Sequence, residues 1–238
     1  EELRAAVLET VRANPGAKAV KICAYLPSIE VEVVPMDPHV AVSIAAYDPA
    51  RDIIARNAGT PHLSRTLSIW IEKERRNRRD DIMPPQAKVA ANYASPMVAK
   101  WRARKNGYDE IVLVDEDGFL AEAPTCNVFL VDGDGALRTP PERRVLLGIT
   151  RKSLIELARH DGREVRVEPI HPDELFEAAE VFLTATTAGA WPVVKVDGKP
   201  VGDGEPGPVT LALGKRLAEV ARGEDPAFAN WVAYAEEG

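Results

Sequence analysis

Two Asp/Gly turns set between apolar runs constrain the fold of this chain more than any other feature. The first turn, DEDG, connects EIVLVD (Glu110–Asp115) to FLAEA (Phe119–Ala123), and the second, DGDG, follows NVFLVD (Asn127–Asp132). Aspartate and glycine tolerate the backbone angles of tight turns, so such turns between alternating runs are a strong hairpin signal. We therefore predict consecutive hairpin strands here, with Glu122 in the middle of one of them.

The rest of the chain alternates between helical and strand patterns. Further strands are predicted at Ala19–Ile29, Val40–Ala46, Thr66–Ile71, Glu164–Glu168, Val181–Thr184 and Val193–Val196. Helical spacing predicts helices over residues 2–14, Ser95–Asn106, Thr150 (as N-cap) to about His160, near Asp173–Ala178 and over Pro208–Val220. Hairpins mixed with helices indicate an α+β fold rather than a doubly wound parallel sheet.

Charge and composition exclude several classes of function. The net charge of −7 argues against non-specific nucleic-acid binding, which needs a basic surface. The basic run Lys73–Arg79 is followed at once by Asp80 and Asp81, so we interpret it as a solvated turn or a subunit contact, with an anionic ligand as the alternative. No apolar run approaches the ~20 residues of a membrane span, and no signal peptide is visible. No membrane partner is therefore expected.

Cysteine and histidine usage bears on compartment and metal binding. Only Cys23 and Cys126 occur, each in an apolar strand-like run, which favours a reducing, cytoplasmic environment over a disulfide framework. The four histidines are scattered without the spacing of metal ligands, so no metal site is predicted.

The segment PQAKVAANY, residues 85–93, places Lys88 among small apolar neighbours, with Tyr93 five residues further on. In poorly hydrated surroundings the charged form of a lysine is disfavoured, and the neutral amine can attack a carbonyl carbon. A Schiff-base lysine needs this property. The alternative is an ordinary solvated loop lysine.

Three further features would complement such a lysine. A carboxylate in an apolar strand, as predicted for Glu122, must be paired or hydrogen-bonded, and it could face a pyridinium nitrogen. Gly148-Ile149-Thr150 opens a helix, where free N–H groups suit a phosphate. The run from Thr184 to Gly189 (TATTAG) offers hydroxyls after a strand. Each feature also has an ordinary structural explanation, but together they form the inventory of a pyridoxal-phosphate site.

Longer motifs resemble those of the class IV aminotransferases, the fold-type IV group that includes branched-chain amino acid aminotransferases. The similarity runs from about Met83 to Leu217. It rests on K-x-x-x-N-Y, GYDEIVLVDEDGFLAE-x-x-x-x-N-V-F, L-x-GITR, DELFEAAEVFLTATTA and P-V-x-x-VDG-x-x-x-GDG-x-PGPVT. The resemblance implies pyridoxal 5'-phosphate as cofactor and a fold with a small N-terminal α/β domain. A larger C-terminal domain would form a pseudo-barrel of strands flanked by helices.

The resemblance also implies residue roles. Lys88 would form the Schiff base with the cofactor and shuttle protons, Tyr93 would bond the ring hydroxyl, and Glu122 would meet the pyridine nitrogen. Leu146 would pack on the ring. The remaining roles are phosphate binding by Ile149, Thr150 and Thr186, and substrate-carboxylate binding by the N–H groups of Thr187 and Ala188.

The implied reaction is transamination between an amino donor and a 2-oxo acid, with branched-chain substrates. Ala123–Cys126 replaces the glycine-rich run of the family, and Ala19–Cys23 lacks the tyrosine and arginine that branched-chain enzymes often carry. A D-amino acid or (R)-amine transaminase, an aminodeoxychorismate-type lyase and a non-catalytic truncated relative therefore stay open as alternatives.

The implied domain organisation assigns residues 1–50 to the remainder of the small domain, 51–62 to a connector and 63–238 to the large cofactor-binding domain. The chain opens at Glu1, inside an amphipathic helix. We therefore expect the small domain to be incomplete and the family's phosphate-binding arginine to lie upstream. A homodimer is expected, because members of the group bury their sites at a two-fold interface.

Overall fold

The computed structural model describes residues 1–30, 34–54, 66–74 and 83–235. Its chain divides into two compact units, residues 1–60 with 233–238 and residues 61–232. Of the predicted connector 51–62, only the part up to Ile54 lies within the described residues, and of the basic run only Lys73 and Glu74 do. No helix of the described ranges is long and apolar enough to cross a membrane.

The first unit contains one helix and a two-stranded sheet. Helix α1 (Glu2–Arg12) contacts β2 (Ala41–Tyr47), which pairs antiparallel with β1 (Ala19–Tyr25). A π-helical turn (Ala50–Ile54) follows. The predicted helix and both predicted strands are thus confirmed, although β1 ends four residues before Ile29.

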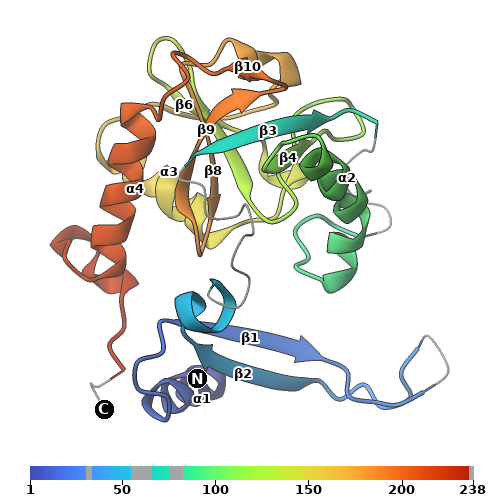
Figure 1. The fold of residues 1–238 in the computed structure, drawn as a ribbon. Coiled ribbons are helices and arrows are strands. Elements are labelled where there is room, and N and C mark those ends of the chain that lie inside the picture. Colours follow the sequence, from blue (N-terminus) through green and yellow to red (C-terminus); the bar gives the residue numbers. More distant parts are fainter. Residues whose placement is uncertain (31–33, 55–65, 75–82, 236–238) are drawn as a thin grey trace. The chain divides into compact units, whose positions relative to one another are not determined.

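The second unit is built on one mixed sheet (Figure 1). Its strand order is β4-β3-β9-β8-β5-β6-β7, with β10 paired to β9. The strands are β3 (Leu67–Glu72), β4 (Glu110–Leu113), β5 (Asn127–Val131), β6 (Leu137–Thr139), β7 (Val165–Val167), β8 (Glu180–Ala185), β9 (Gly189–Val196) and β10 (Lys199–Pro200). Parallel pairs (β3 with β4 and β9, β6 with β7) are combined with antiparallel ones. The predicted α+β class is confirmed.

Helices cover the sheet of this unit. Helix α2 (Ala94–Lys105) contacts β4, α3 (Ile149–His160) contacts β8 and β7, and α4 (Pro208–Ala221) contacts β9, β8 and α3. Short 3₁₀ helices occupy Ala90–Tyr93, Glu142–Arg144, Pro172–Phe176 and Pro226–Trp231. Gly107 has φ +83°, as expected of a glycine that ends a helix in a left-handed turn.

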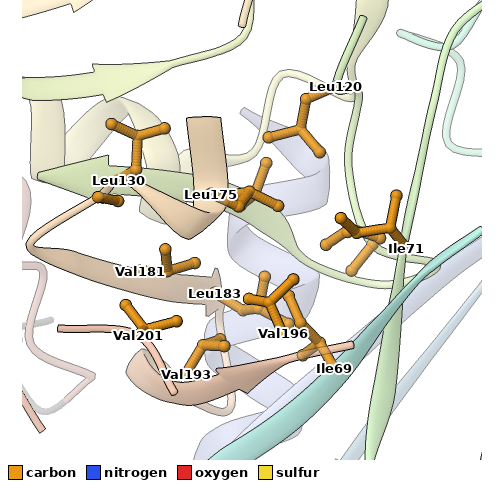
Figure 2. Packing of buried hydrophobic residues seen from close by; sticks show 14 of the residues in the cluster. Ile69, Ile71, Leu120, Leu130, Leu175, Val181, Leu183, Val193, Val196 and Val201 are labelled. Carbon is orange, nitrogen blue, oxygen red and sulfur yellow. The ribbon is translucent and has the colours of Figure 1, made fainter. Parts of the chain in front are cut away.

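Strand β5 shows why the sheet is buried on both faces. Val128 and Leu130 belong to one apolar cluster. Figure 2 shows part of it, with Leu130, Leu175 and Val181 among the labelled side chains. Phe129 points to the other face, where it stacks on Phe182 of β8 with ring centroids 5.0 Å apart under α3 and α4. A strand covered on both faces is apolar throughout rather than alternating. Removing the Phe129 ring would cost about 3–5 kcal/mol.

The predicted hairpin strand Phe119–Ala123 forms only in part. An isolated bridge joins Val114 to Leu120. The N–H of Asp115 donates to Phe119 O at 2.7 Å, and Leu113 exchanges hydrogen bonds with the segment through Ala121 N–H and Glu122 O, both at 2.9 Å. The segment does not become a regular strand, because the N–H of Leu120 donates to Ile170 O and that of Ala123 to Cys126 O, both at 2.8 Å.

Candidate functional site

A cavity of about 340 Å³ lies in the second unit, at the end of strands β5 and β8. Every residue predicted to bind the cofactor lines it: Lys88, Tyr93, Glu122, Leu146, Ile149, Thr150 and Thr186. These residues come from four separate stretches of the chain, so the folding of the sheet brings them together.

Glu122 is the buried charge of the cavity, with 2% of its surface exposed. Its Oε2 accepts hydrogen bonds from Asn127 Nδ2 at 3.1 Å and from the backbone N–H of Leu146 at 3.0 Å. Two donors on one oxygen fix the orientation of the carboxylate. A buried carboxylate held in this way is well suited to stabilise a cationic group of a ligand.

Asn127 is a residue that the sequence analysis did not single out. Its Nδ2 donates both to Glu122 Oε2 and to Leu146 O, the latter at 2.8 Å. A Cβ placed on Gly148 would collide with Asn127 Oδ1, so the glycine makes room for the amide. The signals in the sequence were its place in the motif E-x-x-x-x-N-V-F, five residues after Glu122, and its position at the start of an apolar strand.

Lys88 lies in the loop that leads into the 3₁₀ helix Ala90–Tyr93. The buried side chain of Asn92 holds this loop by donating to Ala87 O at 3.0 Å. Lys88 lines the cavity, yet the residue is exposed, as are Ala90 and Ala91. The predicted poorly hydrated environment is therefore wrong for a single copy of the chain, because small neighbours that are themselves exposed cannot exclude water.

The start of α3 also lines the cavity. The helix begins at Ile149 with Gly148 as N-cap, so the prediction of Thr150 as N-cap is wrong. No side chain caps the helix start. The N–H groups in the first turn of any helix have no intrahelical acceptors, and here no side-chain cap replaces them. They also lie at the positive end of the helix dipole. An anion in the cavity could accept from them.

A buried arginine anchors this first turn. Arg151 is 3% exposed, and it donates to Pro140 O at 2.8 Å and to Thr139 Oγ1 at 3.4 Å. Thr139 in turn donates to Val128 O at 2.8 Å, which ties α3 to β6 and β5. Burial lowers the pKa of the Arg151 guanidinium, and the negative charges of Glu142 and Glu122 oppose this shift.

Thr184 contributes a buried hydroxyl to the cavity. The residue is 1% exposed and lies opposite Asn127 in the pairing of β8 with β5. Within the described residues its Oγ1 finds no hydrogen-bond partner. Buried hydroxyls are normally bonded, so this one is suited to bond a ligand.

Thr187 and Ala188, the predicted substrate-binding residues, do not line the cavity. They lie in the turn between β8 and β9. The N–H of Ala188 donates to Ala185 O at 3.1 Å, so the turn itself already uses this donor. Among the described ranges no three His, Cys, Asp or Glu side chains gather as they would around a metal ion.

Known proteins are similar to the chain over most of its length. The family model for amino-transferase class IV matches residues 1–196. A branched-chain-amino-acid aminotransferase of Salmonella typhimurium is 31% identical over 98% of the chain and 74% of the relative. A probable branched-chain-amino-acid aminotransferase of Aquifex aeolicus is 35% identical over 71% of the chain, but the match spans only 54% of that relative.

A solved structure agrees with the fold. The branched-chain amino acid aminotransferase from Thermobaculum terrenum, in its PLP-form (holo-form), matches with a TM-score of 0.86 and 29% identity. The match covers 98% of this chain and 74% of that structure.

Proposed function

The chain belongs to the class IV aminotransferases, and from this premise we propose that it catalyses pyridoxal-phosphate-dependent transamination between an amino acid and a 2-oxo acid. Branched-chain amino acids are the proposed donors, because the Salmonella and Aquifex relatives carry that name. One observation carries the proposal: a single cavity joins the amine of Lys88, the buried carboxylate of Glu122 and the open start of α3.

The residues present fit pyridoxal phosphate. The cavity volume of about 340 Å³ lies within the usual range for small-molecule sites. The unbonded hydroxyl of Thr184 supplies a donor that no other described residue uses. The lining also matches the ligand in charge, since it includes an acid that suits the ring nitrogen and a helix start that suits the phosphate.

In the proposed complex each lining residue has one task. Glu122 would meet the ring nitrogen, Tyr93 would bond the ring hydroxyl and Leu146 would pack on the ring. Ile149, Thr150 and Thr186 would bind the phosphate. The amine of Lys88 would hold the cofactor.

When bound, the cofactor supplies an electron sink for the electron pair released as the substrate Cα–H bond breaks. Lys88 Nζ would accept the proton from that carbon and deliver it on the cofactor side, which requires its neutral form at the start. The Glu122 carboxylate would stabilise positive charge at the nitrogen opposite it. Asn127 and Leu146 N–H keep its Oε2 fixed for this task.

The substrate carboxylate is proposed to bind at the turn that contains Thr187 and Ala188. The Ala188 N–H would have to exchange its bond to Ala185 O for one to the substrate. Transaminases that act on D-amino acids or (R)-amines, and lyases, could use the same cavity, so the assay below includes their substrates.

We also propose a homodimer. Lys88 is exposed in one copy, and helix α2 beside it exposes Met97, Val98 and Trp101. A second copy that covered this region would exclude water from the amine. A reducing, cytoplasmic setting is proposed as well, because Cys23 and Cys126 are both free thiols.

The test is an assay of the purified protein with added pyridoxal phosphate. We expect a near-visible absorbance band that L-leucine, L-valine or L-isoleucine removes and that 2-oxoglutarate restores. Removal by D-alanine or an (R)-amine alone would assign the other transaminase class. Pyruvate release from 4-amino-4-deoxychorismate without an acceptor would assign a lyase. A protein that stays colourless would refute the catalytic proposal.

A further inference from the structure

Asn127 lies between the buried carboxylate of Glu122 and the segment that leads into α3. It begins β5, is 5% exposed and lines the cavity beside Glu122. The segment that leads into α3, from Leu146 to Gly148, passes directly over its amide. One side chain thus contacts both the buried acid and the approach to the helix start.

The amide nitrogen of Asn127 uses both of its hydrogens. One is donated to Glu122 Oε2 at 3.1 Å and the other to Leu146 O at 2.8 Å. The backbone N–H of Leu146 donates to the same Glu122 oxygen at 3.0 Å. The three residues therefore form a closed triangle of hydrogen bonds.

The chemistry of the triangle dictates the orientation of the amide. If the amide were turned over, its Oδ1 would face two acceptors, the Glu122 carboxylate and the Leu146 carbonyl, and both contacts would be repulsive. Gly148 provides space for Oδ1 on the other side, where a Cβ would collide with it. Asn127 is therefore held in the one orientation that donates to Glu122.

We propose that Asn127 is a positioning residue of this site: it orients the Glu122 carboxylate and couples it to the segment that carries the start of α3. The inference rests on the proposed function in assigning Glu122 to the ring nitrogen. The coupling itself is a property of the chain alone and can be measured without cofactor.

Other ionisable groups around the triangle must be taken into account. Lys88 and Tyr93 line the same cavity, and the Arg151 guanidinium acts on Glu122 from the first turn of α3. Cys126 precedes Asn127, and burial raises the pKa of its thiol to about 11, so it stays neutral at ordinary pH. None of these groups supplies the donor that Asn127 supplies to Glu122 Oε2.

The first experiment measures the free energy of unfolding of the cofactor-free protein against pH. The variants are Asn127→Ala, Asn127→Asp and Asn230→Asp, the last as a control because Asn230 is exposed. In Asn127→Asp two carboxylates face each other, and a proton bound between them restores a donor. The pKa of the pair rises above its unfolded value, so the lost stability should return as pH falls from about 8 to about 5. The Asn230→Asp control should follow the wild-type pH dependence. Asn127→Ala removes a donor from the charged form of Glu122 without adding a second carboxyl group, so it should recover less stability at low pH than Asn127→Asp.

Burial alone would also raise the pKa of an introduced carboxyl group, so the measurement is repeated with Glu122→Gln. If Asn127 acts through Glu122, the recovery at low pH should largely disappear in the double variant Glu122→Gln/Asn127→Asp. An equal recovery with and without Glu122→Gln would overturn the inference.

The second experiment measures the dissociation constant of pyridoxal phosphate by absorbance. Asn127→Ala should raise it about 10-fold or more, since a hydrogen bond to a charged group is lost. In the Glu122→Gln background the same substitution should change it by less than about 3-fold. Equal effects in both backgrounds would contradict a role through Glu122. If no protein binds the cofactor while the pH coupling is present, the proposed function fails and the coupling stands.

Discussion

Thr184 of β8 and Asn127 of β5 are direct partners in the sheet, and both line the cavity. Their side chains differ in one respect that can be tested. The amide nitrogen of Asn127 donates both of its hydrogens to protein groups, whereas the hydroxyl of Thr184 finds no partner within the described residues. Of these two paired residues, Asn127 thus bonds within the protein, and the hydroxyl of Thr184 is left to bond a ligand.

Replacing Thr184 by valine should weaken cofactor binding while leaving the stability of the cofactor-free protein nearly unchanged. Valine keeps the shape and removes a hydroxyl that no described protein group bonds, so the free energy of unfolding without cofactor should change by less than about 1 kcal/mol or increase. The dissociation constant of pyridoxal phosphate should rise about 3- to 10-fold. Urea denaturation and absorbance titration measure the two quantities.

Thr210 provides the matched control. It is also 1% exposed, but its Oγ1 donates to Glu180 Oε2 at 2.7 Å. Thr210→Val should therefore lower the free energy of unfolding by about 1–3 kcal/mol. Equal losses in the two variants would contradict the assignment of the Thr184 hydroxyl to a ligand.

Lys88→Ala should remove turnover without harming the fold. The side chain is exposed, so the free energy of unfolding should change by no more than about 0.5 kcal/mol. The proton transfer from an amino donor should slow by at least about 10²–10⁴-fold. Stopped-flow absorbance with L-leucine measures it, with Lys152→Ala on the exposed side of α3 as the control. Turnover that survives Lys88→Ala would refute the role of this lysine.

Gly148→Ala tests the fit between the α3 approach and Asn127. The backbone angles of Gly148 (φ −61°, ψ 133°) suit alanine, so any effect must come from the collision of the new Cβ with Asn127 Oδ1. We expect a loss of about 1–3 kcal/mol in the free energy of unfolding, together with weaker cofactor binding. Gly133→Ala, where a Cβ would meet no atom within 4 Å, should leave both quantities unchanged.

Cys126 gives a prediction on pH dependence. Burial raises the pKa of its thiol to about 11 in the folded chain, above the ordinary value of 9.0. The folded state therefore keeps the proton where the unfolded state loses it, and stability should fall as pH rises from 9 to 11. The loss is on the order of 2–3 kcal/mol. Cys126→Ala should remove this part of the slope in urea titrations, whereas Cys23→Ala, at an exposed thiol, should not.

Local sequence patterns predicted the helices and strands well, but they did not predict the contacts between residues far apart in the chain. The Asp/Gly turns and the helical periodicities indicated most strands and helices, because turn chemistry and amphipathicity are local. The hairpin strand Phe119–Ala123 formed only in part, since the N–H of Leu120 bonds Ile170 O far along the chain. No local pattern contains that information.

The candidate site shows the same division. The resemblance to a family named residues that the structure brings to one cavity, Lys88 and Glu122 among them. Its motifs contain Asn127 and Thr184 but gave neither a role, because the hydrogen bond of Asn127 to Leu146 O spans 19 residues and the unbonded Thr184 hydroxyl shows only in the folded chain. The exposure of Lys88 was also mispredicted, because apolar neighbours in the sequence do not show whether other parts of the protein bury them.

The anchoring of α3 by Arg151 has a consequence for the order of events in ligand capture. Its hydrogen bonds to Pro140 and Thr139 involve no ligand, so the helix start is rigid before anything arrives. A small oxyanion alone should then be able to settle there with little loss of chain entropy.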